Sequence, residues 1–182
     1  MDYLSVPTMD GDGVNVIVET PRGSRAKFKF APRAGAFMMS RPLALGLHYP
    51  FDWGFIPSTM AEDGDPLDAL IIHDAVSYPG MIIRCRPVAI LEVRQSERGL
   101  TRRNDRVMVA PSESRRQESL DDLRALSYQM REELERFFLA STIGTDKKLE
   151  FLGWRDRNAA RFAIEAAARK YRDGQPGSLN DP

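Results

Sequence analysis

A run of acidic side chains between positions 62 and 68 is the densest group of residues that could do chemistry. Glu62, Asp63, Asp65 and Asp68 place four carboxylates within seven residues, directly before the apolar run 69–72. In an extended segment, Asp63 and Asp65 project to the same side. At about 4 Å and an effective dielectric near 20, each pair of such charges costs roughly 4 kcal/mol. A hard divalent cation with oxygen ligands removes that cost, so the pattern favours a metal site.

The same residues also suit a solvated turn, because Asp, Gly and Pro are common turn formers. The spacing does not match an EF-hand loop, which ends in a glutamate at its twelfth position. Cys85 is the single cysteine, and His48 and His73 are the only histidines. One cysteine excludes an internal disulfide and a cysteine-based zinc site within one chain. Any metal is therefore expected on carboxylates, which favours Mg²⁺, Mn²⁺ or Ca²⁺.

The composition limits the class of partner. The chain has 182 residues, with 26 Lys plus Arg against 26 Asp plus Glu, so its formal net charge is zero. A protein that coats nucleic acid needs a basic excess, so no nucleic-acid partner is expected. The longest stretch without charged residues, 42–51, has ten residues, whereas a membrane span needs about 20 apolar residues. Without a signal peptide at the N-terminus, the expected location is the cytoplasm, with no membrane partner.

The order of patterns predicts one α+β domain: a small closed β-barrel with two C-terminal helices packed outside it. We expect residues 1–13 to form a flexible arm, 14–172 a single domain and 173–182 a disordered tail. Residues 94–105 are expected to form a polar loop. Strands are predicted at 14–18, 26–30, 67–72 and 106–110, with one or two more within 81–93.

Periodicity also predicts how side chains are presented. In the alternating run 26–30, Lys27 and Lys29 share one face and the two phenylalanines share the other. Apolar residues at helical spacing predict a helix over 120–139, with two aspartates in its first turn. A second, alanine-rich helix is expected from about Asp156 to Tyr171. Its expected apolar anchors are Phe162, Ile164 and Tyr171.

The segment EDGDPLDALI at 62–71 resembles the signature of the barrel-fold, magnesium-dependent inorganic pyrophosphatases. The resemblance continues in order and spacing from about residue 15 to residue 172. It includes Glu19 and a proline two residues later, the Lys27-Phe28 pair and Arg41. Further matches are the segment 48–56, the strand pair around 79–88, the run 136–138 and the pair 153–154.

The resemblance implies a role for each matching residue. Asp63 and Asp68 would ligate Mg²⁺, with Mn²⁺ possible, and Asp65 would bind a metal-activated water and act as general base. Glu19 would lie at the cavity rim near a metal carried by the substrate. The expected partner is a small phosphate substrate, and the expected assembly is a homo-oligomer, either a dimer or a hexamer. The residues expected to hold substrate oxygens are Lys27, Arg41, Tyr49 and Arg106.

The sequence departs from the family pattern at residues that do chemistry. Lys29 stands where the family usually has a glutamate, Asn104 where it has a ligating aspartate, and Trp53 where it has a tyrosine. Ser141 and Thr142 replace a Tyr-Lys pair. Because i and i+2 share a strand face, Asn104 and Arg106 are expected to face the cavity and Asp105 to face away. Fewer metal ions, most simply one Mg²⁺, are therefore expected.

These observations favour hydrolysis of inorganic pyrophosphate to two phosphates, with altered or reduced activity. Two alternatives stay open on the same scaffold. One is an enzyme that hydrolyses another phosphoanhydride or a phosphoester. The other is a catalytically silent relative that binds a phosphorylated ligand or a protein. A nucleic-acid-binding barrel is the least favoured interpretation, because the net charge is zero.

Overall fold

The computed structural model describes residues 2–174 and contains a strand-rich body with two α-helices. The helices and strands follow one another as η1 (Tyr3–Ser5), β1 (Met9–Asp10), β2 (Gly13–Thr20), β3 (Ala26–Ala31), β4 (Ala36–Pro42), β5 (Asp52–Ile56), β6 (Leu67–Ile71), β7 (Ile82–Glu97), β8 (Leu100–Arg103), β9 (Arg106–Pro111), η2 (Arg115–Gln117), η3 (Leu123–Ala125), α1 (Tyr128–Ser141), β10 (Lys148–Arg155) and α2 (Arg157–Asp173). The η elements are 3₁₀-helices. No helix among these residues is long and apolar enough to cross a bilayer.

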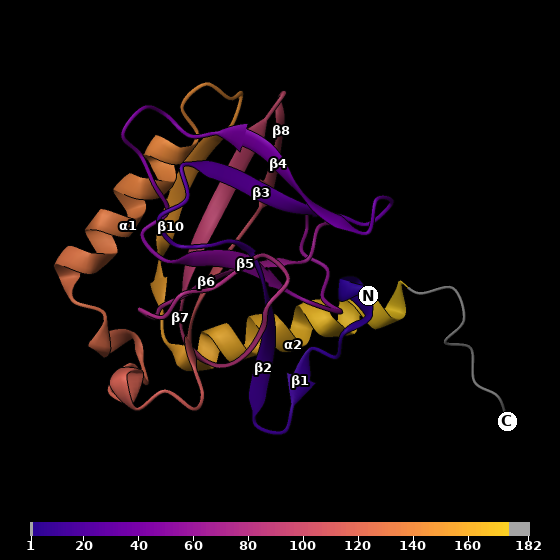
Figure 1. The fold of residues 1–182 in the computed structure, drawn as a ribbon, viewed down its shortest axis with the longest axis vertical. Coiled ribbons are helices and arrows are strands. Elements are labelled where there is room, and N and C mark those ends of the chain that lie inside the picture. Colours follow the sequence, from indigo (N-terminus) through magenta and orange to yellow (C-terminus); the bar gives the residue numbers. More distant parts are fainter. Residues whose placement is uncertain (1, 175–182) are drawn as a thin grey trace, which may run out of the picture.

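The main sheet closes on itself. Its strands run in the order β1-β2-β5-β6-β9-β7-β10, and β2 also pairs with β7. The strands β2, β5, β6, β9 and β7 therefore form a ring, which matches the small closed sheet predicted from the sequence. All of these pairings are antiparallel except the one between β6 and β9. The hairpin β3–β4 forms a separate two-stranded sheet beside the ring (Figure 1).

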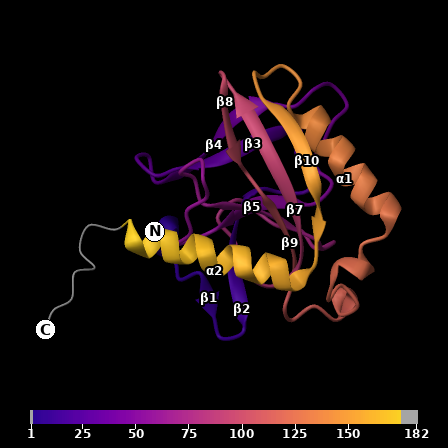
Figure 2. The ribbon, with the colours of Figure 1, turned by 180° about the vertical axis from the view of Figure 1, so that it is seen from behind.

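Two apolar clusters fill the space inside and outside the ring. One includes Val16, Ile56 and Val107 and extends to Ile164 of α2. The other includes Leu91 and Met108 and extends to the α1 residues Leu134, Phe137 and Phe138. Helix α1 lies beside β10, and α2 crosses the other end of the body (Figure 2). Both helices therefore pack against strands of the main sheet. The other ends of these strands carry polar side chains.

The first α-helix is shorter than its sequence pattern predicts. Helix α1 begins at Tyr128, where the Ser127 hydroxyl accepts a hydrogen bond from the Met130 N–H at 3.1 Å. The preceding segment contains the 3₁₀-helix η3, which Asp122 caps. The predicted helix over 120–139 was therefore wrong in its first two turns. The apolar residues there still pack on the core, because successive 3₁₀ turns also bring them to one side.

The second helix agrees closely with the prediction. The Asp156 carboxylate accepts a hydrogen bond from the Ala159 N–H at 3.0 Å and caps α2. Ile164 is buried as expected. Phe162, however, is 68% exposed, so it is not an anchor of this helix. Residues two positions apart on a helix point about 200° apart, so both cannot face the same core.

Other differences concern the ends of the body. Residues 94–105, expected as a loop, belong instead to the β7–β8 hairpin, in which β8 pairs with the end of β7. Strand β10 was missed, because the alternation of residues 148–151 is short and ends at a bulge between Phe151 and Gly153. Residues 2–13, expected as a flexible arm, include η1 and the short strand β1, and Thr8 donates a hydrogen bond to the Pro57 carbonyl. Residues 175–182 of the expected tail lie outside the described residues.

Candidate active site

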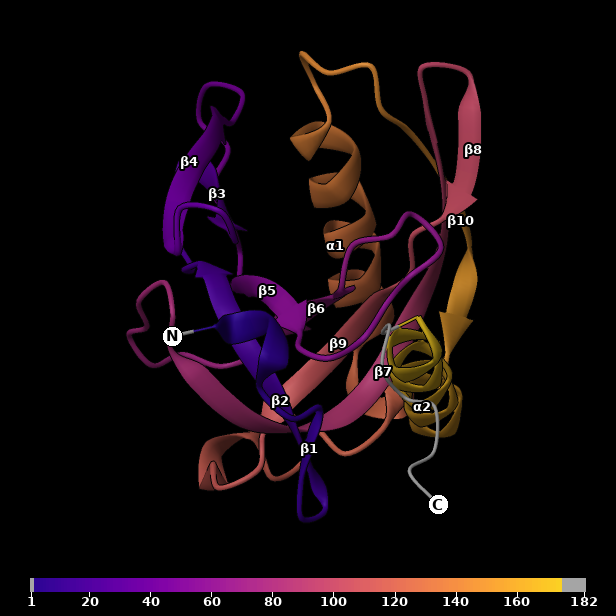
Figure 3. The ribbon, with the colours of Figure 1, turned by 90° about the vertical axis from the view of Figure 1, so that its right-hand side faces the viewer.

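A polar cavity of about 230 Å³ lies between the β3–β4 hairpin, the edge of the ring and the C-terminal end of α1. Figure 3 shows the hairpin on one side and the β7–β8 hairpin on the other, with α1 between them. At roughly 30 Å³ per water molecule, this volume suits a small ligand. The cavity is lined by Lys27, Lys29, Ser40, Arg41, Tyr49, Trp53, Asp68, Gln95, Asn104, Arg106, Phe137, Phe138, Ser141, Thr142 and Lys147.

The hairpin supplies a cationic wall. Lys27 and Arg41 are cross-strand partners in β3–β4, so their side chains lie side by side. Lys27 and Lys29 both reach the cavity, which confirms that they share a strand face. Arg41 also donates a hydrogen bond to the Ser141 carbonyl at the end of α1. This bond links the hairpin to the helix on the far side of the cavity.

The floor of the cavity combines a carboxylate with a buried guanidinium. Asp68 in β6 is the direct cross-strand partner of Arg106 in β9. The Arg106 guanidinium lies 5.3 Å from the Trp53 ring centre and 4.5 Å from the Phe138 ring centre. Arg106 is only 6% exposed, and this burial lowers the pKa of its guanidinium. The two aromatic rings therefore fix the guanidinium in position at the cavity.

The three aspartates of the signature do not gather around one point. The Asp65 carboxylate pairs with the Lys29 ammonium at 2.9 Å, so it faces a lysine. The Asp63 carboxylate accepts a hydrogen bond from the Asp65 backbone N–H at 3.2 Å. Asp68 lines the cavity, and Asp65 shares one neighbouring cavity with Asp68 and another with Asp63. Within the described residues no three such carboxylates come close enough together to hold one metal ion, so the expected convergence is not found.

The wall formed by β7 and β9 carries amides. The Asn104 side-chain amide donates to the Gln95 side-chain oxygen at 3.3 Å, and both residues line the cavity. Asp105 points the other way, where it accepts hydrogen bonds from the Val93 backbone N–H and from Arg103. The predicted strand faces are thus confirmed: Asn104 and Arg106 face the cavity and Asp105 does not.

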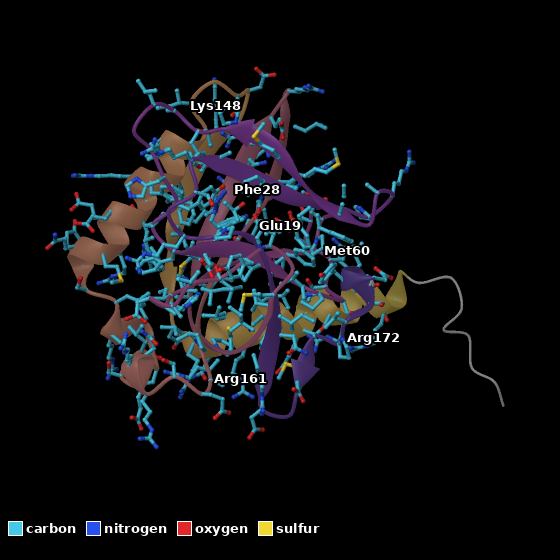
Figure 4. The ribbon with its side chains drawn as sticks, in the orientation of Figure 1. Glu19, Phe28, Met60, Lys148, Arg161 and Arg172 are labelled. Carbon is cyan, nitrogen blue, oxygen red and sulfur yellow. The ribbon has the colours of Figure 1, made fainter. Side chains whose placement is uncertain are left out.

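Glu19 in β2 and Lys27 in the hairpin lie close enough for the charge of each to influence the pKa of the other. Glu19 is 5% exposed and accepts a hydrogen bond from the Phe30 N–H at 2.7 Å. It lies between the ring and the hairpin (Figure 4) and lines a neighbouring cavity with Lys29, Asp65 and Asp68, so its expected place at the cavity rim stays a prediction. Burial raises the pKa of Glu19 to about 7, and burial lowers the pKa of Lys27 to about 8. The charges of Asp68 and Glu19 oppose the change at Lys27.

Aromatic side chains complete the cavity. Tyr49 lines it and packs edge-on against Phe137 at 5.1 Å between ring centres. Burial raises the pKa of the Tyr49 hydroxyl well above its usual range, so that group stays protonated. Trp53 lies 5.4 Å beneath the Lys27 ammonium. The Ser141 and Thr142 hydroxyls donate to the carbonyls of Phe138 and Leu139, both at 2.8 Å, so these donors are already used within α1.

The sequence patterns missed the lining residue Lys147, which reaches the cavity from the segment between α1 and β10. Gln95 reaches the cavity from the end of β7. The adjacent lysines at 147 and 148 were a visible signal. They could not be placed because β10 itself was not predicted.

Comparisons with known proteins agree with this architecture. The model of the inorganic pyrophosphatase family matches residues 16–172. The chain belongs to this family. A curated inorganic pyrophosphatase from Synechocystis sp. is 32% identical over 173 residues, which cover 94% of this chain and all of the relative. One from Streptomyces coelicolor is 34% identical, with 87% and 96% covered. The crystal structure of the Thermus thermophilus inorganic pyrophosphatase superposes with a TM-score of 0.87 at 31% identity, covering 94% and 99% of the two chains.

The family is generally metal-dependent, so the donor set of this chain matters. A divalent ion held by aspartates needs several oxygens at 2.0–2.6 Å from one point. Within residues 2–174, no three His, Cys, Asp or Glu side chains come close enough together to hold a metal ion. The Asp65 carboxylate is already paired with the Lys29 ammonium. Positions 95 and 104 carry side-chain amides and not carboxylates. As arranged, these side chains do not fit a divalent metal site.

Proposed function

We propose that this chain hydrolyses inorganic pyrophosphate to two phosphate ions in the cavity between the β3–β4 hairpin and the ring, at a lower rate than its relatives. The observation that carries the proposal is the position of Lys27 and Arg41 opposite Arg106, with Asp68 between the two walls. Guanidinium and ammonium groups bind phosphate oxygens strongly. Full-length similarity to proteins named inorganic pyrophosphatase supports the same substrate.

Each side chain has a role that follows from its chemistry. Lys27, Arg41 and Arg106 hold the phosphate oxygens and stabilise the negative charge that develops on the leaving phosphate. The protonated Tyr49 hydroxyl is a further donor at the cavity wall. Asp65, which lies beside the cavity and is bonded to its lining residue Lys29, is the general base that takes a proton from the attacking water. The water oxygen then bonds to one phosphorus atom while the bridging oxygen leaves with the other phosphate.

The reduced rate follows from the surroundings of Asp65. Its carboxylate is held by the Lys29 ammonium at 2.9 Å, and a neutralised carboxylate is a weaker base. The hydroxyls of Ser141 and Thr142 are bonded within α1, and they add no positive charge. Several groups that would stabilise the transition state are therefore missing or already paired.

The identity of the cofactor stays a prediction. Mg²⁺, or Mn²⁺, would be the preferred ion for a site built from aspartate oxygens. We derive no role for such an ion in the chemistry, because its donors are not assembled. Self-association as a dimer or a hexamer also stays a prediction, which sedimentation velocity of the purified chain would test.

The test is an assay of phosphate release from pyrophosphate, run with Mg²⁺, with Mn²⁺ and with a chelator. Nucleoside polyphosphates and sugar phosphates serve as alternative substrates in the same assay. Preferred release from pyrophosphate supports the proposal. Faster release from another substrate would favour the phosphoanhydride or phosphoester alternative. Absence of release from every substrate would favour the catalytically silent alternative.

A further inference from the structure

The charges that line the cavity itself are mostly cationic, whereas the cavities that adjoin it carry Glu19, Asp63, Asp65 and Glu97. Its lining contains one carboxylate, that of Asp68. The remaining polar groups are amides and hydroxyls, which carry no charge at neutral pH. A cavity with this balance attracts an anion and repels a cation. Five cationic side chains line it, namely Lys27, Lys29, Arg41, Arg106 and Lys147.

Two buried donors in this cavity lack an acceptor. Among the described residues, the Arg106 Nε and the Trp53 Nε1 have no hydrogen-bond partner, although both atoms are fully buried. Arg106 is held against the Trp53 and Phe138 rings, and Trp53 is itself 3% exposed. Neither donor can turn to solvent without breaking this packing. Buried N–H groups without acceptors are unfavourable, and this packing also closes both atoms off from a ligand in the cavity, so the guanidinium acts on an anion through its charge and its other N–H groups.

Lys29 adds positive charge directly beside an aspartate of the signature. Its ammonium pairs with the Asp65 carboxylate at 2.9 Å and lines the same cavity as Lys27. A divalent cation at Asp65 would have to displace this ammonium and approach the other cations.

We propose that the cavity recognises inorganic diphosphate as the free anion, with the side chains of Lys29 and Arg106 supplying positive charge in place of a divalent metal. The inference rests on the proposed function only for the location of the ligand. It predicts that Mg²⁺ weakens binding, because the magnesium complex of diphosphate carries less negative charge than the free anion. It also predicts a marked loss of affinity at high salt.

The test is isothermal titration of the purified chain with imidodiphosphate, a slowly hydrolysed diphosphate analogue. One titration contains a chelator and the other contains excess Mg²⁺. We expect binding in the chelator, and an affinity lower by about tenfold or more in Mg²⁺, which corresponds to the loss of one charge-assisted hydrogen bond. Binding only in the presence of Mg²⁺ would overturn the inference and leave the proposed function intact.

The remaining outcomes separate the two proposals. Absence of binding in both solutions would overturn the inference and contradict the proposed function. Binding in the chelator, together with no phosphate release from pyrophosphate under any condition, would support the inference and contradict the proposed function.

Three variants locate the effect. Arg106→Met should lower the affinity in the chelator by about tenfold or more. Because Arg106 is buried, its circular dichroism spectrum must first show that the variant folds. Lys29→Met changes an exposed side chain and keeps the test valid if Arg106→Met is unstable. Arg94→Met is the matched control, since Arg94 pairs with Glu150 and does not line the cavity.

Lys29→Met also has a signature that a purely structural role would not produce. It should lower the affinity for imidodiphosphate in the chelator and, at the same time, raise the affinity for Mg²⁺ alone, because the Asp65 carboxylate is released. If Lys29→Met leaves the affinity in the chelator unchanged, Lys29 does not replace the metal charge, and the inference is wrong in that respect.

Discussion

The two sides of the cavity carry different functional groups. The segment before β6 and the start of β6 itself retain the aspartates of the family signature, at positions 63, 65 and 68. The opposite side, formed by β7 and β9, presents the amides of Gln95 and Asn104 together with the Arg106 guanidinium. A metal ion between the two sides would need oxygens from both. The difference therefore shifts charge neutralisation from a bound ion to the side chains of the protein.

The comparison also shows why the fold tolerates this change. Asn104 and Arg106 project from the strand face that lines the cavity, whereas Val107 and Val109 are fully buried in the core. The pairing of β6 with β9 and of β7 with β9 depends on the backbone and on those buried residues. Chemistry at the cavity and stability of the ring thus depend on different side chains of the same strand, as expected when function resides in a site and not in a fold.

The largest expected effect comes from the carboxylate side. Asp65→Asn should lower the rate of pyrophosphate hydrolysis by about 10²-fold or more, because an amide keeps the shape but cannot take a proton. Steady-state phosphate release measures the effect, with thermal unfolding to show that the fold is intact. Asp121→Asn changes another aspartate, an exposed one between two 3₁₀-helices, and is the control. Turnover at the wild-type rate in Asp65→Asn would show that Asp65 is not the base.

A second prediction concerns Glu19, whose buried carboxyl lies beneath the carboxylate side of the cavity. The pKa of Glu19 rises from 4.5 to about 7 on folding, chiefly through burial. The folded state therefore binds more protons than the unfolded state in this window, so stability decreases as pH rises from about 4.5 to 7. The shift corresponds to a loss of at most about 3 kcal/mol in the free energy of unfolding at pH values above that window. Glu19→Gln should abolish this part of the pH dependence.

Urea unfolding of the wild type and of Glu19→Gln, at a series of pH values across that window, measures the difference. The stability of the variant should exceed that of the wild type most clearly above neutral pH. Thr20→Val, at the next position of β2, would control for loss of a buried polar group. Parallel stability curves for the wild type and Glu19→Gln would show that Glu19 is not shifted by burial.

Much of the difference between the two sides of the cavity can be predicted from the sequence. Strong alternation placed Lys27 and Lys29 on one face, and the family motif aligned Asn104 with a ligand position. All three residues line the cavity. Strands with compact apolar runs, such as β6 and β9, were predicted within a residue or two of their observed ends. These features depend on local periodicity, which a single sequence records directly.

The features that the sequence did not predict depend on contacts between distant segments. The ion pair between Lys29 and Asp65 joins residues 36 positions apart, and it separates carboxylates that spacing alone would bring together. The burial of Glu19 depends on how the β3–β4 hairpin folds over the ring. Lys147 was missed because it precedes β10, and the alternation of that strand is interrupted by a bulge between Phe151 and Gly153 where it pairs with β7.

A third prediction restores the missing carboxylates on both sides at once. Lys29→Glu combined with Asn104→Asp should raise the affinity for Mg²⁺ by about tenfold or more, because hard divalent ions prefer several converging carboxylates. If the rest of the cavity is intact, hydrolysis in Mg²⁺ should also rise. Isothermal titration with Mg²⁺ alone measures the affinity. Lys148→Glu adds a carboxylate on an exposed residue outside the cavity and controls for net charge.

Either of two results would contradict this prediction. An unchanged Mg²⁺ affinity in the double variant would mean that the two sides lie too far apart to share an ion. Two or more tight Mg²⁺ sites in the unaltered chain would mean that the present carboxylates already suffice.

The smallest expected effect tests the register of β9. Asp105 accepts hydrogen bonds from the Val93 N–H at 2.9 Å and from Arg103, on the side away from the cavity. Asp105→Asn should therefore lower stability by about 1 kcal/mol, since it weakens charge-assisted bonds in a partly exposed position. Thermal unfolding measures this loss.

The affinities for Mg²⁺ and for imidodiphosphate should stay within about twofold of the wild type in Asp105→Asn, because the changed group faces away from both ligands. A clear loss of Mg²⁺ affinity would place Asp105 in the cavity and shift the register of β9 by one residue. In that case the amide side of the cavity would carry a carboxylate after all, and the contrast between its two sides would disappear.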